Sequence, residues 1–303
     1  MIKAAVMAGA NNAQLNRLVQ LLHDHPDVEL IGYADAGNIG QTLDNLYPAL
    51  TGETDLTVSE TINPADADVV FLAGEPNAAV KFMDNPALPE NLIVIDMTGA
   101  FRNTDDARFV QGIPELNRKA MVRGARFVAM PDATTTAVSL ALLPLAKNLM
   151  LKNPVTTVVV ANSTEAEPES LTNKLIEQNT LSEIEKALTS LQPALPVTVK
   201  GVAFHGDIPE GIMAVTTVDT DLSLDELTKI YEEFYDDHNF TFIVDNVPDI
   251  SDVRDTNKSF IHLAKTGNKA LITTALDTDM KGGAGNAVHA MNLLFGLIEK
   301  VGL

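Results

Sequence analysis

The residues of this 303-residue chain that could do chemistry are six histidines and a hydroxyl-rich segment at residues 131–136. No two histidines have the i, i+4 spacing of a helical metal site and no H-E-x-x-H motif occurs, so the sequence predicts no metal site. His205 lies in the short segment F-H-G-D before an expected strand, which makes it the candidate for an acid–base role. The alternative is an ordinary surface or core histidine.

Residues 131–136 read P-D-A-T-T-T and lie between an expected strand and an expected helix. Hydroxyl groups at the start of a helix can help to bind an anion. Their more common role is to cap the helix, and we favour that interpretation. A threonine nucleophile would also need a base within hydrogen-bond reach, and none is adjacent in the sequence.

The composition excludes several classes of chemistry. The chain has no cysteine, which excludes disulfides, thiolate metal sites, iron–sulfur clusters and attack on a carbonyl by the protein's own thiolate. With 21 basic and 41 acidic residues the net charge is −20, and no basic cluster offers a face for nucleic acid. No apolar run approaches the about 20 residues of a membrane span. The first residues do not read as a signal peptide, so we expect a cytoplasmic protein.

The elements that must position these residues alternate between strand and helix in the first half of the chain. Helical spacing of apolar residues follows the first strand, and a helix containing Pro144 is expected at residues 138–149, with a kink at the proline. Buried strands are expected at residues 4–8, 28–33, 69–73, 93–96 and 127–130. This alternation predicts the α/β class with a Rossmann-like doubly wound parallel sheet.

The pattern changes after about residue 151, where strands dominate and predict an α+β domain. We expect one helix over residues 167–191, with capping-box spacings that begin at Thr180 and Ser182. A hairpin is expected around Gly267. The apolar spacing of the last helix runs from Val288 to Ile298.

The first strand–helix turn is the candidate cofactor site. A dinucleotide-binding turn has the pattern G-x-G-x-x-G, whose glycines permit a tight turn and close approach to the pyrophosphate. The candidate cofactor-binding residues here are Gly9, Ala10, Asn11 and Asn12. Only Gly9 fits the pattern. Asparagine tolerates positive φ, so the turn itself can form, but by itself it favours a Rossmann-like turn without a ligand.

Three groups of motifs, taken in order along the chain, closely resemble N-acetyl-gamma-glutamyl-phosphate reductases, which are relatives of aspartate-semialdehyde dehydrogenase. They are G-A-F-R at residues 99–102, G-I-P-E-L-N-R at residues 112–118, and M-K-G-G-A-G-N-A-V at residues 280–288, which M-N-L-L-F-G follows. The resemblance implies an NADP-type Rossmann domain, an α+β substrate and dimerisation domain, and a last helix that packs back on the first domain. We place these at residues 1–133, 134–280 and 281–303, and the family implies a homo-oligomer, a dimer or a tetramer.

The chemistry that the resemblance implies is reductive dephosphorylation of an acyl phosphate. A cysteine in a P-G-C motif forms a thioester, and hydride from NADPH then releases the semialdehyde. In this chain the motif reads P-D-A, so the position of the nucleophile is Ala133. The family's H-x-H-x-P-E-I segment, which carries the acid–base histidine, begins here with Gln178, Asn179 and Thr180.

Two further motifs of the family are altered. The glycine-rich loop S-x-G-A-G aligns with residues 163–167, which carry two glutamates in place of glycines. The P-R-G motif places Glu210 where an arginine holds the substrate phosphate, and a carboxylate there would repel that phosphate.

These losses predict a non-catalytic paralogue, either a partner or regulator of an active reductase or a ligand-binding protein, with weak or absent NADP binding. The alternative is an NADP(H)-dependent oxidoreductase that transfers hydride to an aldehyde without a thioester. His205 or Asp207 would then be the proton donor.

Overall fold

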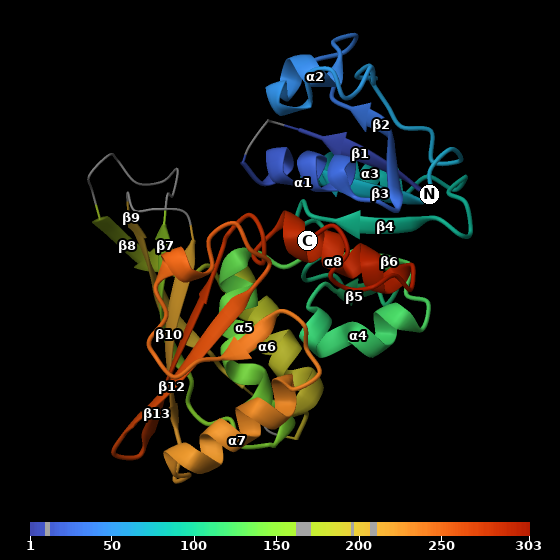
Figure 1. Ribbon diagram of the computed structural model, residues 1–303. Helices are drawn as coiled ribbons and strands as arrows, with labels where there is room; N and C mark the ends of the chain where they lie inside the picture. The colour runs from blue at the N-terminus through green and yellow to red at the C-terminus, as the bar shows by residue number, and fades with distance from the viewer. Residues whose placement is uncertain (10–12, 162–170, 195–196, 207–210) are drawn as a thin grey trace. The chain divides into compact units, whose positions relative to one another are not determined.

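The computed structural model describes residues 1–9, 13–161, 171–194, 197–206 and 211–303 (Figure 1). The chain forms two compact units. Met1–Met130 and Gly283–Leu303 together make the first unit, and Pro131–Gly282 makes the second. Each unit has its own sheet, and the two are described separately below.

The first unit contains a six-stranded parallel sheet in the order β2-β1-β3-β4-β6-β5. Its elements are β1 (Ile2–Ala8), α1 (Ala13–Asp24), β2 (Val28–Ala34), α2 (Leu43–Leu46), η1 (Pro48–Leu50), β3 (Val69–Ala73), α3 (Pro76–Met83), β4 (Ile93–Asp96), β5 (Phe109–Gln111), α4 (Pro114–Val122), β6 (Phe127–Ala129) and α8 (Ala284–Leu294). The predicted Rossmann-like parallel sheet is therefore confirmed.

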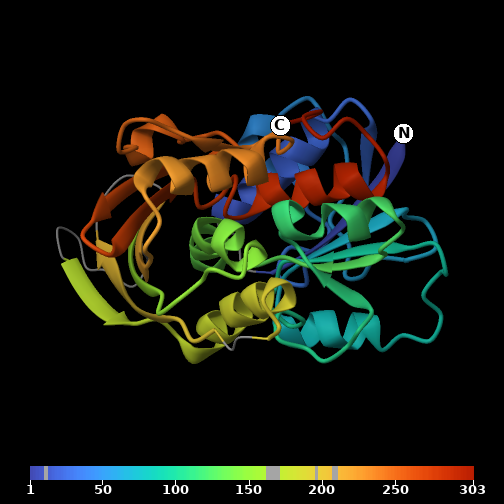
Figure 2. The ribbon, with the colours of Figure 1, turned by 90° about the horizontal axis from the view of Figure 1, so that it is seen from below.

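Alternating side chains of each central strand enter two different cores. In β1, Ala4 and Val6 join the core that contains α1 and α8, whereas Ala5 joins the core that contains α3. Phe71 and Val70 divide in the same way between the two faces of β3. Figure 2 shows α3 on the face of the sheet opposite to α1 and α8. Strands that are buried on both faces explain the dense apolar runs in the sequence.

The C-terminal segment completes the first unit through polar contacts as well as apolar packing. The His25 ring nitrogen Nε2 lies 3.1 Å from Asn292 Oδ1, and both residues are buried. The Glu299 carboxylate contacts His289 Nε2 at 2.8 Å and also pairs with Arg118. The helix α8 ends at Leu294, and Ile298 is 78% exposed, so the predicted extension of this helix to Ile298 is wrong. Gly296, with φ at +67°, turns the chain there.

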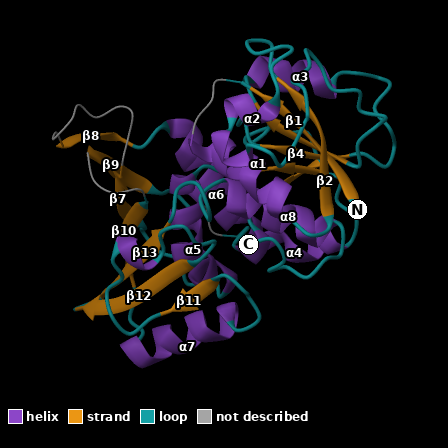
Figure 3. Cartoon of the chain, turned by 45° about the horizontal axis from the view of Figure 1, so that its top comes forward, coloured by secondary structure: helices purple, strands orange, loops and turns teal. Residues whose placement is uncertain are grey.

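The second unit contains a seven-stranded mixed sheet in the order β11-β12-β13-β10-β7-β9-β8. Its elements are α5 (Ala133–Lys147), β7 (Val155–Ala161), β8 (Leu171–Leu175), α6 (Gln178–Leu191), β9 (Lys200–Gly206), β10 (Ile212–Asp219), α7 (Leu224–Tyr235), β11 (Thr241–Ile243), η2 (Ile250–Asp252), β12 (Ser259–Thr266) and β13 (Lys269–Leu276). Both α5 and α7 contact the sheet and each other, and Figure 3 shows α7 beside β11 and β12.

The expected helix over residues 167–191 is wrong at residues 171–177, and residues 167–170 lie outside the described residues. Leu171–Leu175 forms β8, which pairs antiparallel with β9 at the edge of the sheet. Only Gln178–Leu191 is helical, and the N-cap is Glu177. Thr180 and Ser182 therefore lie inside α6, and neither begins a capping box. Pairing with a strand distant in sequence overrides the local helical pattern here.

The helix α5 is the centre of the second unit and begins at Ala133, five residues earlier than predicted. Pro144 lies inside it and has no N–H to donate to the Leu140 carbonyl one turn before. The Tyr235 hydroxyl donates to that carbonyl at 2.5 Å. The Tyr231 hydroxyl donates in the same way to the Ala141 carbonyl, also at 2.5 Å. Burial raises the pKa of Tyr231 far above its usual range, so this hydroxyl stays a donor.

We expect Tyr235→Phe to cost about 2 kcal/mol of unfolding free energy, because it leaves the buried Leu140 carbonyl without a donor. Tyr231→Phe should cost about 1 kcal/mol, because the Ala141 carbonyl still accepts the helical N–H of Leu145. Urea unfolding of the two variants measures the difference. Adding Pro144→Ala supplies the missing N–H and should shrink the cost of Tyr235→Phe. Equal costs in both backgrounds would contradict this role of Tyr235.

Candidate functional site

A pocket of about 310 Å³ lies at the N-terminus of α5, within the second unit. It is the candidate functional site because it contains Ala133, the position that the sequence singled out. Its polar lining consists of two carboxylates, two threonine hydroxyls and one ammonium group, and the remainder is apolar. The lining residues are Asp132, Ala133, Thr134, Lys174, Ile176, Glu177, Thr180, Ala203 and Ile212.

Asp132 fixes the wall of the pocket at the start of α5. Its Oδ1 accepts the backbone N–H of Thr135 at 2.7 Å, which is an N-cap, and its Oδ2 accepts the Thr180 hydroxyl of α6 at 3.2 Å. One carboxylate thus joins the first turns of two helices. The prediction that hydroxyl groups of residues 131–136 cap the helix is wrong, because the side chain that caps α5 is the carboxylate of Asp132.

A second hydrogen bond, between buried groups, joins the same two helices. The Thr135 hydroxyl donates to Glu183 Oε2 at 3.1 Å, and the Glu183 side chain is buried with 1% of its surface exposed. A buried carboxylate needs such donors, because burial without a partner is costly. The hydroxyl of Thr135 is therefore used in the structure and does not face a ligand.

Ala133 is the first helical residue of α5. A Cβ atom built on Gly282 would lie 2.6 Å from the Ala133 methyl, so the backbone at Gly282 packs directly against that methyl group. A nucleophile at the start of a helix would profit from the positive end of the helix dipole, which favours an anion such as a thiolate. A methyl group at this position can form no covalent intermediate.

Lys174 supplies the cationic side of the pocket and comes from β8. Its Nζ lies 3.8 Å from Glu177 Oε1, three residues further along the chain. Both side chains are substantially exposed, so the pair is solvent-screened. The described pocket can therefore form hydrogen bonds and charge contacts with a small polar ligand.

The structure brings together only some of the residues that the sequence proposed. Ala133 and Thr180 lie in the same pocket. Gln178 is exposed, and its amide donates to Ser182 on its own helix at 3.3 Å. Asn179 belongs to the first turn of α6. His205 lies in β9, paired with Val160 and Thr172.

Other proposed positions lie outside the described residues. These are Ala10, Asn11, Asn12, Asp207, Glu210 and the loop at residues 163–167. Their roles stay predictions. Sequence reasoning missed Lys174 and Glu177, because the segment that contains Lys174 was assigned to a helix, whereas it forms β8 and the turn into α6. These two residues could have been found only if residues 171–175 had been recognised as an edge strand.

The carboxyl edge of the parallel sheet in the first unit is where a dinucleotide binds in this fold. A Cβ atom on Gly9 would lie 2.9 Å from Gly74 Cα, and one on Gly74 would lie 2.6 Å from the Ala8 carbonyl oxygen. The turns after β1 and β3 therefore touch, and only glycine fits at both positions. Glycine at these two positions therefore lets the two turns meet at the edge of the sheet where the fold would hold a dinucleotide.

Asp96 ends β4 at the same edge. Burial raises the pKa of its carboxyl group, while three hydrogen bonds act in the opposite direction. The donors are the backbone and hydroxyl of Thr98 and the backbone N–H of Phe101. The carboxylate is fully buried and orders the turn that leaves the strand.

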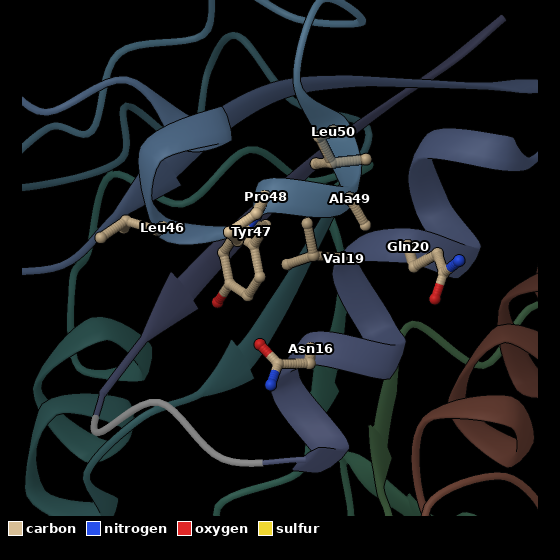
Figure 4. Close-up of a pocket in the computed structure, with 8 residues that line it drawn as sticks. All are labelled: Asn16, Val19, Gln20, Leu46, Tyr47, Pro48, Ala49 and Leu50. Atoms are coloured by element: carbon tan, nitrogen blue, oxygen red, sulfur yellow. The ribbon is translucent and has the colours of Figure 1, made fainter.

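A smaller pocket of about 200 Å³ lies between α1 and the segment formed by α2 and η1 (Figure 4). Tyr47 is on one side of it, and Asn16 and Gln20 come from α1. The Tyr47 hydroxyl is already bonded to the Tyr33 hydroxyl at 2.6 Å. The smaller pocket offers few polar groups, and we interpret it as a gap in the packing of α1 against α2 and η1.

Among the described residues, no group of three or more acidic or histidine side chains could hold a metal ion. In that part of the chain there is also no helix long and apolar enough to cross a membrane.

Comparison with known proteins identifies the class of protein that has this fold. Residues 5–123 match the semialdehyde dehydrogenase NAD binding domain, and residues 175–278 match the semialdehyde dehydrogenase dimerisation domain. Aspartate semialdehyde dehydrogenase II from Vibrio cholerae superposes with a TM-score of 0.77 at 15% identity, covering 98% of this chain and 99% of that one. The enzyme from Candida albicans, solved with NADP, gives a TM-score of 0.74 at 14% identity, covering 97% and 99%. The chain has the semialdehyde dehydrogenase fold.

The relatives by sequence are more specific. The chain is 38% identical over 317 residues to N-acetyl-gamma-glutamyl-phosphate reductase of Parabacteroides distasonis, covering 100% of this chain and 98% of the relative. The reductase of Bacteroides thetaiotaomicron is also 38% identical, over 318 residues with the same coverage. This chain belongs to the N-acetyl-gamma-glutamyl-phosphate reductase family, and the resemblance inferred from the motifs is confirmed.

We expect Asp132→Ala to lower the unfolding free energy by about 1–2 kcal/mol, because the variant loses the N-cap of α5 and the bond to Thr180. Urea denaturation measures this loss. Asp225→Ala, which removes an exposed carboxylate from the first turn of α7, is the matched control and should cost no more than about 0.5 kcal/mol. Equal losses for the two variants would show that Asp132 does not organise the site.

Proposed function

We propose that this chain is a non-catalytic member of the N-acetyl-gamma-glutamyl-phosphate reductase family that works by binding a ligand or a partner. The observation that carries the proposal is Ala133 at the first position of α5, inside the pocket. The thioester route requires a thiolate, and the chain has no cysteine at any position.

The rest of the pocket supports the same proposal. Thr180 and Gln178, at the family's histidine segment, are bonded to Asp132 and Ser182 and offer no imidazole. The described lining has one ammonium group against two carboxylates, which is poorly suited to an acyl phosphate. A pocket with hydroxyls, an ammonium and carboxylates is better suited to a small polar ligand with both donor and acceptor groups.

The purified protein should give no phosphate-dependent reduction of NADP or of NAD with N-acetylglutamate semialdehyde above the rate without protein. The absorbance of the reduced nicotinamide measures this. Turnover above background that disappears in His205→Ala would contradict the proposal. That outcome would favour hydride transfer to an aldehyde without a covalent intermediate.

Ala133→Cys alone should not restore the reductase reaction, because the histidine and arginine positions are also changed. The new thiol would be the only one in the chain, so a thiol-specific chromogenic disulfide reports whether it is accessible. Thr134→Cys, one residue further into α5, is the control for a thiol without the family's position. Reductase activity in Ala133→Cys and not in Thr134→Cys would show that the remaining site is intact.

We also infer that a second copy of this chain covers the open face of the second sheet. The face toward the helices is buried, whereas half-buried apolar residues line the other face. They are Val159, Met213, Val215 and Phe260. Val159, Met213 and Val215 lie on the adjacent strands β7 and β10, and Phe260 lies on β12, with β13 between β12 and β10. The region that matches the family's dimerisation domain contains three of the four residues.

Val215→Glu should shift the protein from a homo-oligomer to a monomer, because the carboxylate would be desolvated in the interface. Light scattering during gel filtration measures the mass. Lys229→Glu, on the exposed surface of α7, is the matched control and should leave the mass unchanged. A monomeric wild-type protein would contradict the inference, and a new species on mixing with an active reductase of the family would instead indicate hetero-association.

A further inference from the structure

The end of β2 carries an acidic residue at the level of the dinucleotide edge. Met7 of β1 pairs with Ala34 of β2, and Ala8 pairs with Ala73 of β3. The residues that leave the three strands, Asp35, Gly9 and Gly74, therefore follow one another across the same edge of the sheet. β1 lies between β2 and β3, which is the point where the strand order reverses.

Asp35 is held in place by its own turn. Its Oδ1 accepts the backbone N–H of Gly37 at 2.9 Å, and its Oδ2 accepts the Asn38 side-chain amide at 2.7 Å. The residue is 9% exposed. A carboxylate offers about four lone-pair sites, so two of them are left for further donors. A charge that is largely withdrawn from water is also screened less than one on the surface.

The segment around Asp35 contains no compensating cation. No lysine or arginine occurs between Arg17 and Lys81, whereas acidic residues occur throughout that stretch, from Asp24 to Glu75. The stretch supplies the ends of both β2 and β3. A 2′-phosphate carries about two negative charges at neutral pH and is normally matched by arginine or lysine.

We propose that the first unit selects a dinucleotide with an unphosphorylated adenosine ribose, NAD(H), over NADP(H), and that Asp35 is the residue that discriminates. The two remaining acceptor sites of its carboxylate receive the ribose hydroxyls, whereas a 2′-phosphate meets an uncompensated negative charge. In folds of this kind an acidic residue at this place accepts the ribose 2′-hydroxyl. The proposal concerns binding alone and is independent of whether the chain catalyses a reaction.

The test is binding of NADH and NADPH to the full chain, without substrate, by nicotinamide fluorescence and by thermal shift. The wild-type protein should bind NADH at least tenfold more tightly than NADPH. Asp35→Asn keeps the acceptor for Gly37 and removes the charge, so it should bring the two affinities within threefold of each other. Glu29→Gln removes an exposed charge from the opposite end of β2 and should keep the wild-type ratio.

Three results would overturn the proposal: NADPH binding as tightly as NADH, an unchanged ratio in Asp35→Asn, or no binding of either nucleotide at millimolar concentration. If Asp35→Asn does not fold, Asp35→Ser is the second variant, because its hydroxyl can still accept the Gly37 N–H. A loss of the ratio in Glu29→Gln as well would assign the effect to net charge and not to Asp35.

Discussion

The carboxylate of Asp132 is the interaction on which the candidate site depends. It caps α5 with one oxygen and holds Thr180 of α6 with the other, so the two helices that border the pocket share one anchor. The Thr135–Glu183 bond repeats the connection one layer deeper. The Asp132 carboxylate occupies the positive end of the helix dipole of α5, where an anionic ligand would otherwise bind, and it offsets the partial positive charge there. Such a start of α5 suits the proposed role in binding better than one in catalysis.

Much of the fold followed from the sequence because its signals are local. The strands β1, β3 and β4 are buried on both faces, and continuous apolar runs reveal that directly. The boundaries of β8 and α6 were not predictable in the same way. Leu171–Leu175 has no strong strand pattern and is an edge strand only because β9 is available to pair with it. The early start of α5 depends on one capping side chain, which a search for apolar periodicity does not detect.

The candidate site was predictable where a motif fixed a position, and unpredictable where tertiary pairing supplied the residue. Ala133 and Thr180 came from aligned motifs and lie in one pocket. Lys174 and Ala203 line that pocket from β8 and β9, which lie next to each other only once the sheet has formed. The discriminating role proposed for Asp35 needed the register of β1 against β2, since residues around Asp35 have no motif of their own.

The division of the chain into units has a consequence for biosynthesis. Residues 283–303 belong to the same unit as the first 130 residues, and the whole second unit lies between them in sequence. On the ribosome, α1 and α4 are therefore made long before α8, which contains Asn292, and the segment after it, which contains Glu299, are available to cover them. While Pro131–Gly282 is synthesised, the apolar face of α1 that α8 later covers is still exposed. We therefore expect the nascent first unit to be most prone to aggregation, and most in need of chaperones, during this interval.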